Sequence, residues 1–266
     1  MSSVHLVGDA ILDNFYWLPE KDKDLRKEIS VLGYEVYNYA VDNIKVSDII
    51  NGIVPDESYV KARSYPYSTE KDGKMYPLRL ISKNGKVNRS FTNVYAGFNS
   101  IGSQKERDDM IVISMGGNDI FSKFKSIIFG VDYFINSVLT DDFIANYEKI
   151  IETAKGTCNK IVLVSIYLPY LGVGSSYGIY SALAKPVMDK WHTFIYRIAR
   201  KHKIPVLDLS RTFNIGERLH YGTDDTRASN IANSCIAKCI AYIHKNYDGH
   251  HVYFCPDCDF SKITIE

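Results

Sequence analysis

Apolar and polar positions along this chain predict strands and helices in alternation. Short apolar runs that stop at glycine or at a charged residue predict buried strands, and apolar residues at a spacing of three or four predict amphipathic helices. The predicted strands are residues 4–7, 35–40, 110–115, 160–166 and 204–209. The predicted helices are residues 21–33, 46–53, 141–155, 181–202 and 229–246. This alternation is typical of a three-layer α/β/α fold, and we expect a mostly parallel five-stranded sheet.

Residues 56–108 do not follow the alternation. The segment is polar, contains several tyrosines and carries Asn84-Gly85 between two extended stretches, which is a strong hairpin signal. About 50 residues without structure are unusual in a compact domain, so we expect an inserted β-hairpin with flanking loops. Two interpretations remain open. The insertion is either an inert surface excursion or a cap over the active site, because ligands bind near the carboxyl ends of parallel strands.

The composition is that of an ordinary globular protein. The chain has 266 residues, of which 45% are hydrophobic and 24% charged, and a single domain of this length can bury its own core. We therefore predict one domain over residues 1–250, which includes the insertion, followed by a C-terminal tail at 251–266. The 20 tyrosines reflect either compositional drift or a tyrosine-lined binding surface, and we favour drift.

Charge and hydropathy exclude several classes of partner. A formal net charge of +1 argues against a general nucleic-acid binder. No apolar run approaches the roughly 20 residues of a membrane span, and residues 1–7 lack the basic and apolar stretches of a signal peptide. The five cysteines form an odd count without even spacing. We therefore expect reduced thiols and a cytoplasmic location.

Two polar motifs follow the first and third predicted strands. Residues 8–14 read Gly-Asp-Ala-Ile-Leu-Asp-Asn, and residues 116–119 read Gly-Gly-Asn-Asp. Together with the α/β alternation, these motifs resemble the SGNH, or GDSL-type, hydrolases, in which the first block is Gly-Asp-Ser and the third is Gly-x-Asn-Asp. The resemblance covers most of the chain outside residues 56–108 and the tail, and it implies a flavodoxin-like sheet.

The closest resemblance is to a subgroup whose first block is Gly-Asp-Ser-Ile-Phe/Leu-Asp-Asn. The same subgroup carries Ala-Val-Asp-Gly, Ser-x-Gly-Gly-Asn-Asp, Thr-Ile-Tyr and Pro-Val-Leu-Asp-Leu. The similar segments here are Ala40–Asn43, Ser114–Asp119, Ser165–Tyr167 and Pro205–Leu209.

The resemblance implies a serine ester hydrolase without a cofactor. In the family, the serine attacks an acyl carbon, a histidine near the C-terminus takes the proton, and an aspartate three residues before it orients the imidazole. Backbone N–H groups of the nucleophile and of a second-block glycine hold the oxyanion together with the third-block asparagine. Those roles fall on position 10, on Asn43, which replaces the glycine, and on Asn118. Asp9 and Gly117 are expected beside the substrate.

Ala10 stands where the nucleophilic serine belongs. A methyl group has no lone pair, so this chain as written cannot form an acyl-enzyme. The surrounding motif is intact, which favours an engineered replacement of the nucleophile. Natural loss of catalysis is the alternative.

The last block departs from the family as well. Its Asp-x-x-His-Pro-Ser aligns with residues 224–229, so Asp224 matches the orienting carboxylate and Arg227 occupies the histidine position. A guanidinium cannot act as a base near neutral pH, although the subgroup often has Glu-Pro-Ser here. His220 is the nearest imidazole and is a candidate base, but a solvated loop side chain is favoured. Arg227 is either a surface arginine or a ligand for a substrate carboxylate or phosphate.

Several other polar motifs are better explained by structure than by chemistry. Asp9 follows a strand at a turn, where a carboxylate commonly caps backbone N–H groups, and we expect that role for it rather than direct catalysis. Residues 172–176, Gly-Val-Gly-Ser-Ser, lack the ending of a phosphate-binding loop and are interpreted as a loop beside the active-site mouth.

The cysteines offer a possible metal site, which we do not favour. Cys255 and Cys258 form a single Cys-x-x-Cys close to His250 and His251, so that four zinc ligands would have to come from nine residues. A terminal strand or a tail with ordinary thiols is the stronger interpretation, and no metal is expected. The other pair, Cys235 and Cys239, has helical i, i+4 spacing and is expected to face the core.

Two functional hypotheses follow. The first is an esterase or deacylase that removes an acyl or acetyl group from a small molecule, glycan or modified protein, in a form with serine at position 10. The second is a non-catalytic binding protein that keeps the pocket and engages a protein partner through residues 56–108. The intact motifs favour the first hypothesis, whereas the tyrosines of the insertion and Arg227 favour the second.

Overall fold

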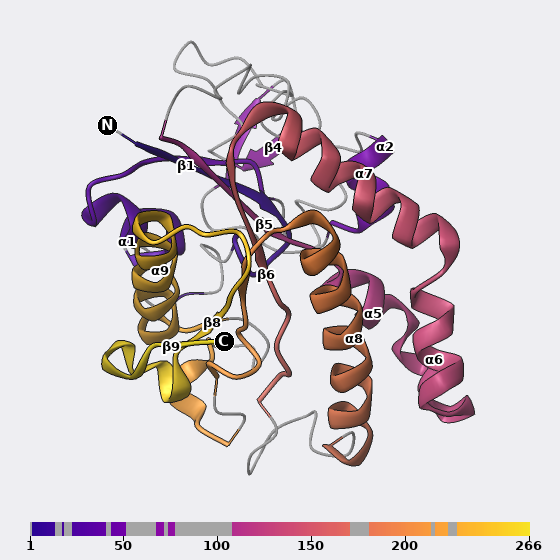
Figure 1. Cartoon of the computed structure of the whole chain (residues 1–266). Coiled ribbons are helices and arrows are strands. Elements are labelled where there is room, and N and C mark those ends of the chain that lie inside the picture. Colours follow the sequence, from indigo (N-terminus) through magenta and orange to yellow (C-terminus); the bar gives the residue numbers. More distant parts are fainter. Residues whose placement is uncertain are drawn as a thin grey trace.

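A computed structural model describes residues 2–266 with several gaps. The residues outside the description are 1, 14–17, 19–22, 41–43, 52–67, 72–73, 78–107, 171–180, 214–215 and 223–227. Figure 1 shows a central sheet with helices on both of its faces, which is the expected three-layer α/β/α arrangement.

The central sheet has seven strands in the order β2-β1-β5-β6-β7-β8-β9. All neighbouring pairs are parallel except β8 with β9. The chain passes from β1 to β2 on one side and later crosses to β5 on the other side, so the strand order reverses beside β1. The strands are β1 Ser3–Gly8, β2 Glu35–Asn38, β5 Met110–Ser114, β6 Lys160–Val164, β7 Val206–Leu207, β8 Val252–Phe254 and β9 Thr264–Ile265.

Helices α1 and α9 pack together on one face of the sheet, and α7 and α8 lie on the other face with α2, α5 and α6 (Figure 1). Their bounds are α1 Leu25–Val31, α2 Val46–Asn51, α5 Gly117–Lys123, α6 Val131–Val138, α7 Asp141–Thr157, α8 Ser181–His202 and α9 Asn230–Lys245. The 3₁₀ turns are η5 Phe124–Phe129, η7 Arg218–His220, η8 Pro256–Cys258 and η9 Phe260–Lys262. Among the described residues, no helix has both the length and the apolar character needed to cross a membrane.

The core lies along the central strands. Every residue of β1 and β5 is buried, and β6 is buried after its first residue. A parallel strand that is covered on both faces reads as a continuous apolar run instead of an alternating one. This explains why Met-Ile-Val-Ile in β5 and Ile-Val-Leu-Val in β6 could be recognised from the sequence alone.

The fold class is confirmed, but the predicted number of strands was wrong. Residues 251–266, which were expected to form a tail, add β8 and β9 to the sheet beside β7. Strands of three and two residues are too short for a periodic pattern to emerge. Their place in the sheet is instead fixed by backbone pairing, which includes the reciprocal hydrogen bonds between Val252 and Glu266.

The insertion contains an antiparallel pair of strands within its described part. Strand β3, Ser68–Lys71, pairs with β4, Lys74–Pro77, with two residues between them. The predicted Asn84-Gly85 turn lies outside the described residues, and so does the loop at 172–176.

Candidate active site

The turn after β1 depends on Gly8. This residue has φ of +134°, and a Cβ atom placed on it would lie 1.6 Å from the carbonyl oxygen of Ser114. Only glycine allows both that conformation and that close approach. The next residue, Asp9, donates its N–H to the same carbonyl oxygen at 2.9 Å. The end of β1 is therefore held directly against the end of β5.

Asp9 holds the turn together with its side chain. The carboxylate is buried, and its Oδ1 accepts hydrogen bonds from the Ser114 hydroxyl at 3.0 Å and from the Ile11 N–H at 3.2 Å. Its carbonyl oxygen accepts from the N–H groups of Leu12 and Asp13. These contacts wind residues 9–13 into a single helical turn at the carboxyl end of β1.

Ala10 lies in this turn and is partly exposed. Its methyl group stands at the carboxyl edge of the sheet, beside the point at which the strand order reverses. Ligands of open α/β sheets bind at such reversal points. The position is suitable for a nucleophile, but an alanine side chain cannot supply one.

The Gly-Gly-Asn-Asp motif lies against the first motif. Gly116 has φ of +104°, and a Cβ atom there would lie 2.2 Å from the Trp191 ring. A Cβ atom on Gly117 would lie 3.2 Å from Oδ2 of Asp9 and 3.6 Å from the Ile166 side chain. The two motifs, more than 100 residues apart in the sequence, therefore meet at one edge of the sheet.

Asn118 follows Gly117 in the second motif and lies on the partly exposed side of the site. It lies in the first turn of α5, is partly exposed, and donates a hydrogen bond from Nδ2 to the Ile44 carbonyl oxygen at 2.9 Å. A carboxamide nitrogen carries two hydrogens, and this contact uses one of them. Asn43 itself lies outside the described residues, but the contact with Ile44 brings Asn118 next to that part of the chain.

Asp119 is a partly buried carboxyl group behind Asn118. Its Oδ2 accepts a hydrogen bond from the Val46 N–H at 3.1 Å, which joins α5 to the start of α2. Burial raises the pKa of Asp119 to about 6, although the Val46 contact and the charge of Lys45 both act to lower it. The group therefore changes its charge within an accessible pH range.

His220 is buried, with 4% of its surface exposed, so it is not the solvated loop side chain that we favoured. It ends η7, its carbonyl oxygen accepts the Ser229 N–H at 2.9 Å, and its ring lies 6.1 Å from that of Phe213. The prediction was wrong because a histidine between predicted elements carries no local sequence signal of burial. Asp224 and Arg227, its predicted neighbours in the last block, lie outside the described residues.

Another histidine, His192, lies near Gly117 at the carboxyl edge of the sheet and was missed from the sequence. His192, on α8, has Nε2 3.5 Å from the carbonyl oxygen of Ile166, whose side chain flanks the position of Gly117. Its ring stacks on that of Tyr196 at 5.9 Å. No motif surrounds His192 in the sequence, so only the packing of α8 against the sheet reveals where it lies.

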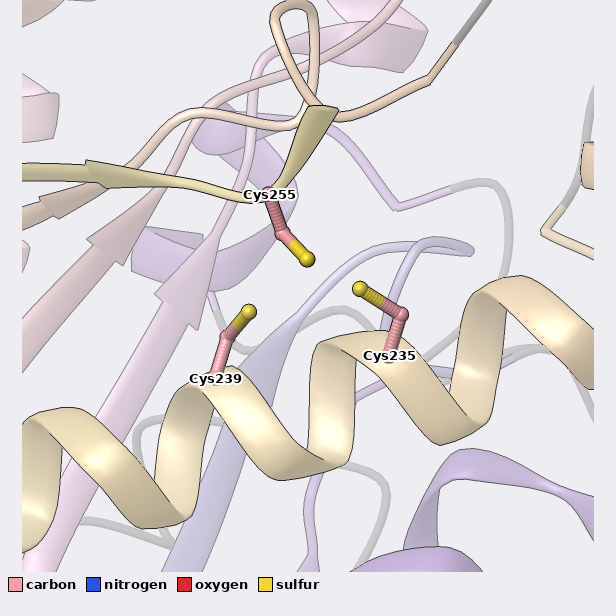
Figure 2. Close-up of side chains that lie close together, drawn as sticks. All are labelled: Cys235, Cys239 and Cys255. Carbon is pink, nitrogen blue, oxygen red and sulfur yellow. The ribbon is translucent and has the colours of Figure 1, made fainter. Parts of the chain in front are cut away.

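The cysteines of α9 are buried as expected, but they are not isolated in the core. Cys235 and Cys239 meet Cys255 from the C-terminal segment (Figure 2). The sequence carries a signal for this meeting that we overlooked. Cys235 and Cys239 form a Cys-x₃-Cys pair, and Cys255 and Cys258 form a Cys-x₂-Cys pair. The two pairs are separated by 15 residues, a spacing similar to that of zinc sites.

A protein-family model described as the GDSL-like Lipase/Acylhydrolase family matches residues 71–252. No match was found among curated proteins.

Several solved structures have a similar fold. One is a catalytic mutant of Axe2, an acetylxylan esterase from Geobacillus stearothermophilus, with 15% identity, a TM-score of 0.50, and coverage of 94% of this chain and 98% of that one. Another is a carbohydrate acetylesterase family member from Sinorhizobium meliloti, with 11% identity, a TM-score of 0.51, and coverage of 92% and 98%. A third, TesA, has 12% identity, a TM-score of 0.50, and coverage of 92% and 99%.

Proposed function

The chain belongs to the GDSL-like lipase/acylhydrolase family, and we propose that it is an ester hydrolase in the form that carries serine at position 10. The observation that carries this proposal is the contact between the first and third motifs. The turn that holds Ala10 packs directly on Gly117, next to Asn118, at the reversal point of the sheet. A nucleophile at position 10 would therefore face the expected oxyanion donors.

The proposed reaction needs a serine oxygen, a base and a water molecule. The serine oxygen bonds to the acyl carbon while the base takes its proton, and the base then gives that proton to the departing alcohol. Water next attacks the acyl carbon while the base takes a proton from the water. The bond to the serine oxygen then breaks, the base returns the proton to that oxygen, and the acid is released. The N–H of residue 10 and the second amide hydrogen of Asn118 would stabilise the negative oxygen in both steps, with the backbone N–H of Asn43 as a further candidate.

We propose His220 as the base and Asp224 as the group that orients it. The burial of His220 in the segment that leads to α9 supports this choice, because the family's last block immediately precedes the same helix. His192 is the competing base, since it lies close to Ile166 and thus to Gly117. Arg227 would then bind an anionic part of the substrate.

Ala10 also supports a second candidate function. A chain that keeps the frame of the site but lacks the nucleophile could bind an ester or glycan without cleaving it. We propose that Ala10 replaces a catalytic serine in an engineered variant, and the binding protein is the alternative. The ester hydrolase and the binding protein predict different results for a serine at position 10: it would restore ester hydrolysis in the first and have no effect on activity in the second.

The first experiment compares this chain with its Ala10→Ser and Ala10→Gly variants. We expect Ala10→Ser to hydrolyse p-nitrophenyl acetate with a kcat at least about a thousandfold higher, and to be labelled at residue 10 by a fluorophosphonate probe. The glycine variant is the matched control, because it changes the same site without adding an oxygen. A folded Ala10→Ser variant that is neither faster nor labelled would exclude the hydrolase and favour the binding protein.

The base is tested in the Ala10→Ser background. We expect His220→Ala to abolish probe labelling, whereas His250→Ala, which alters an exposed histidine of the C-terminal segment, leaves the labelling unchanged. Retained activity in His220→Ala together with loss in His192→Ala would assign the base to α8.

We further propose a small-molecule or glycan ester as the substrate and the cytoplasm as the location. The two solved relatives named as acetyl esterases make acetylated xylo-oligosaccharides a suitable second assay substrate. None of the five cysteines forms a disulfide in the structure, which agrees with a reducing compartment.

A further inference from the structure

Four cysteines from two distant segments gather between α9 and the C-terminal segment. Cys235 and Cys239 lie one turn apart on α9, and Cys255 follows β8. The three sulfur atoms lie within 4.8 Å of one another, and all three residues are buried. Figure 2 shows their side chains pointing toward a common centre, Cys255 from one side and the helix pair from the other.

Cys258 brings a fourth sulfur to the same group. Cys258 lies three residues after Cys255, at the end of the η8 turn, and its thiol forms a side-chain hydrogen bond with that of Cys235. Its Sγ also donates to the Thr212 carbonyl oxygen at 3.8 Å. The fifth cysteine, Cys158, is buried elsewhere and donates from Sγ to the Asp109 carbonyl oxygen at 2.9 Å.

The backbone between Cys255 and Cys258 forms a tight turn. Asp257 and Cys258 have φ of +56° and +54°, a region that residues other than glycine rarely occupy. The Cys255 N–H donates to the Thr212 hydroxyl, and the Cys258 N–H donates to the Thr212 carbonyl oxygen and to that of Cys255. Two successive left-handed residues are unfavourable in themselves, and these hydrogen bonds offset part of that cost.

We propose that Cys235, Cys239, Cys255 and Cys258 bind one zinc ion as a closed tetrathiolate site. Zn–S bonds of about 2.3 Å in a tetrahedron place the sulfurs roughly 3.8 Å apart, within the span observed for the three sulfurs. Binding would release the four thiol protons. With four protein ligands no position is left open for a substrate, so the ion is structural and independent of the proposed hydrolase activity.

The surrounding charges favour a cation at this centre. One lysine, Lys238, and two carboxylates, Asp257 and Asp259, stand next to these cysteines in the chain. One lysine opposes two carboxylates, so a divalent ion would supply most of the charge needed to hold four thiolates. The nearby histidines are not needed as ligands, because His251 pairs with Asp248 at 2.8 Å and His250 is exposed.

The proposed ion would attach the β8–β9 edge of the sheet to α9. Strands β8 and β9 have only three and two residues, and the η8 turn between them carries Cys255 as its N-cap and Cys258 at its end. A zinc ion would tie this segment to α9, which otherwise touches it through side-chain packing. It would also hold the left-handed turn at Asp257 and Cys258 in place.

The test measures metal content of the full chain purified under reducing conditions without a chelator. We expect elemental analysis to find one zinc per chain, and a mercurial reagent to release it as the thiols react. Replacing zinc with Co²⁺ should give thiolate-to-cobalt charge-transfer bands and the intense visible bands of tetrahedral cobalt. These measurements use the unaltered chain, so they do not depend on whether a variant folds.

Variants assign the ligands. Cys239→Ser and Cys255→Ser should each lose the zinc and the cobalt spectrum, whereas Cys158→Ser, a buried cysteine outside the cluster, should keep both. Three outcomes would overturn the proposal: no more zinc in the parent than in Cys255→Ser, iron with inorganic sulfide in place of zinc, or a disulfide among the four cysteines by mass spectrometry of the freshly purified, denatured chain.

Discussion

At the scale of single residues, burial changes the chemistry of a side chain more than its neighbours in the sequence do. Asp119 follows Asn118 in a polar motif, and nothing in the sequence distinguishes the pKa of its carboxyl group from that of an exposed aspartate. In the fold, the loss of water around Asp119 outweighs the hydrogen bond from Val46 and raises its pKa to about 6. The raised pKa means that the ionised form of Asp119 costs the folded chain free energy.

We predict that Asp119 makes the chain less stable as pH rises from about 4 to 6. In this window the folded chain keeps a proton that the unfolded chain has released, since the pKa falls from about 6 to an ordinary 3.8 on unfolding. Asp119→Asn should therefore raise the free energy of unfolding at pH 7.5 by up to about 3 kcal/mol, at 1.36 kcal/mol for each pKa unit. At pH 4 the variant and the parent should differ little.

Urea unfolding at the two pH values measures the effect. Asp189→Asn is the control, because Asp189 is an exposed carboxylate paired with Lys185 at 2.9 Å and its loss should change stability little. An equal effect of Asp119→Asn at pH 4 and pH 7.5 would show that the buried charge is not the cause.

At the scale of elements, the candidate site depends on how closely two strands end together. Gly8 lets the end of β1 meet the end of β5, and Gly116 lets the next turn pass the Trp191 ring. The long helices are less dependent on such contacts. Helix α8 spans Ser181–His202, as its apolar spacing predicted. Helices α5 and α6, of seven and eight residues, were not predicted from the sequence.

We predict opposite effects for two glycine-to-alanine substitutions. Gly8→Ala should cost more than about 3 kcal/mol or prevent folding, because its Cβ would overlap the Ser114 carbonyl oxygen and its φ is +134°. Gly156→Ala, within α7, should stabilise the chain by about 0.5–1 kcal/mol, because nothing lies near its Cβ and alanine favours helix. Chemical denaturation compares the two, and a Gly8→Ala variant as stable as the parent would contradict the close approach.

At the scale of the whole molecule, the C-terminal segment is part of the sheet. It pairs with β7 through β8, and its last residue, Glu266, forms a bidentate ion pair with Arg211 at 2.6 Å. Arg211 in turn lies over the Phe254 ring at 3.5 Å. The segment therefore covers an edge of the sheet that would otherwise expose unpaired backbone groups.

We predict that removing residues 251–266 destabilises the whole chain. The truncation exposes the edge of β7 and removes two of the four clustered cysteines, so we expect aggregation or a Tm lower by at least about 10 °C in a thermal scan. The full-length double variant Cys255→Ser/Cys258→Ser separates the two effects, because it keeps the strand pairing. A truncated chain that unfolds at the parent's temperature would mean that β8 and β9 contribute nothing to stability.

The sequence by itself determined the local elements and the family resemblance. Buried strands such as β5 and long helices such as α8 follow from patterns within a few residues. The two glycine motifs predict that the candidate site lies at the carboxyl ends of β1 and β5. The tertiary structure decided the rest: the burial of His220, the pKa of Asp119, and the place of β8 and β9 in the sheet. Each of these depends on contacts between segments far apart in the chain, and a local pattern of residue types carries no information about which distant segments will touch.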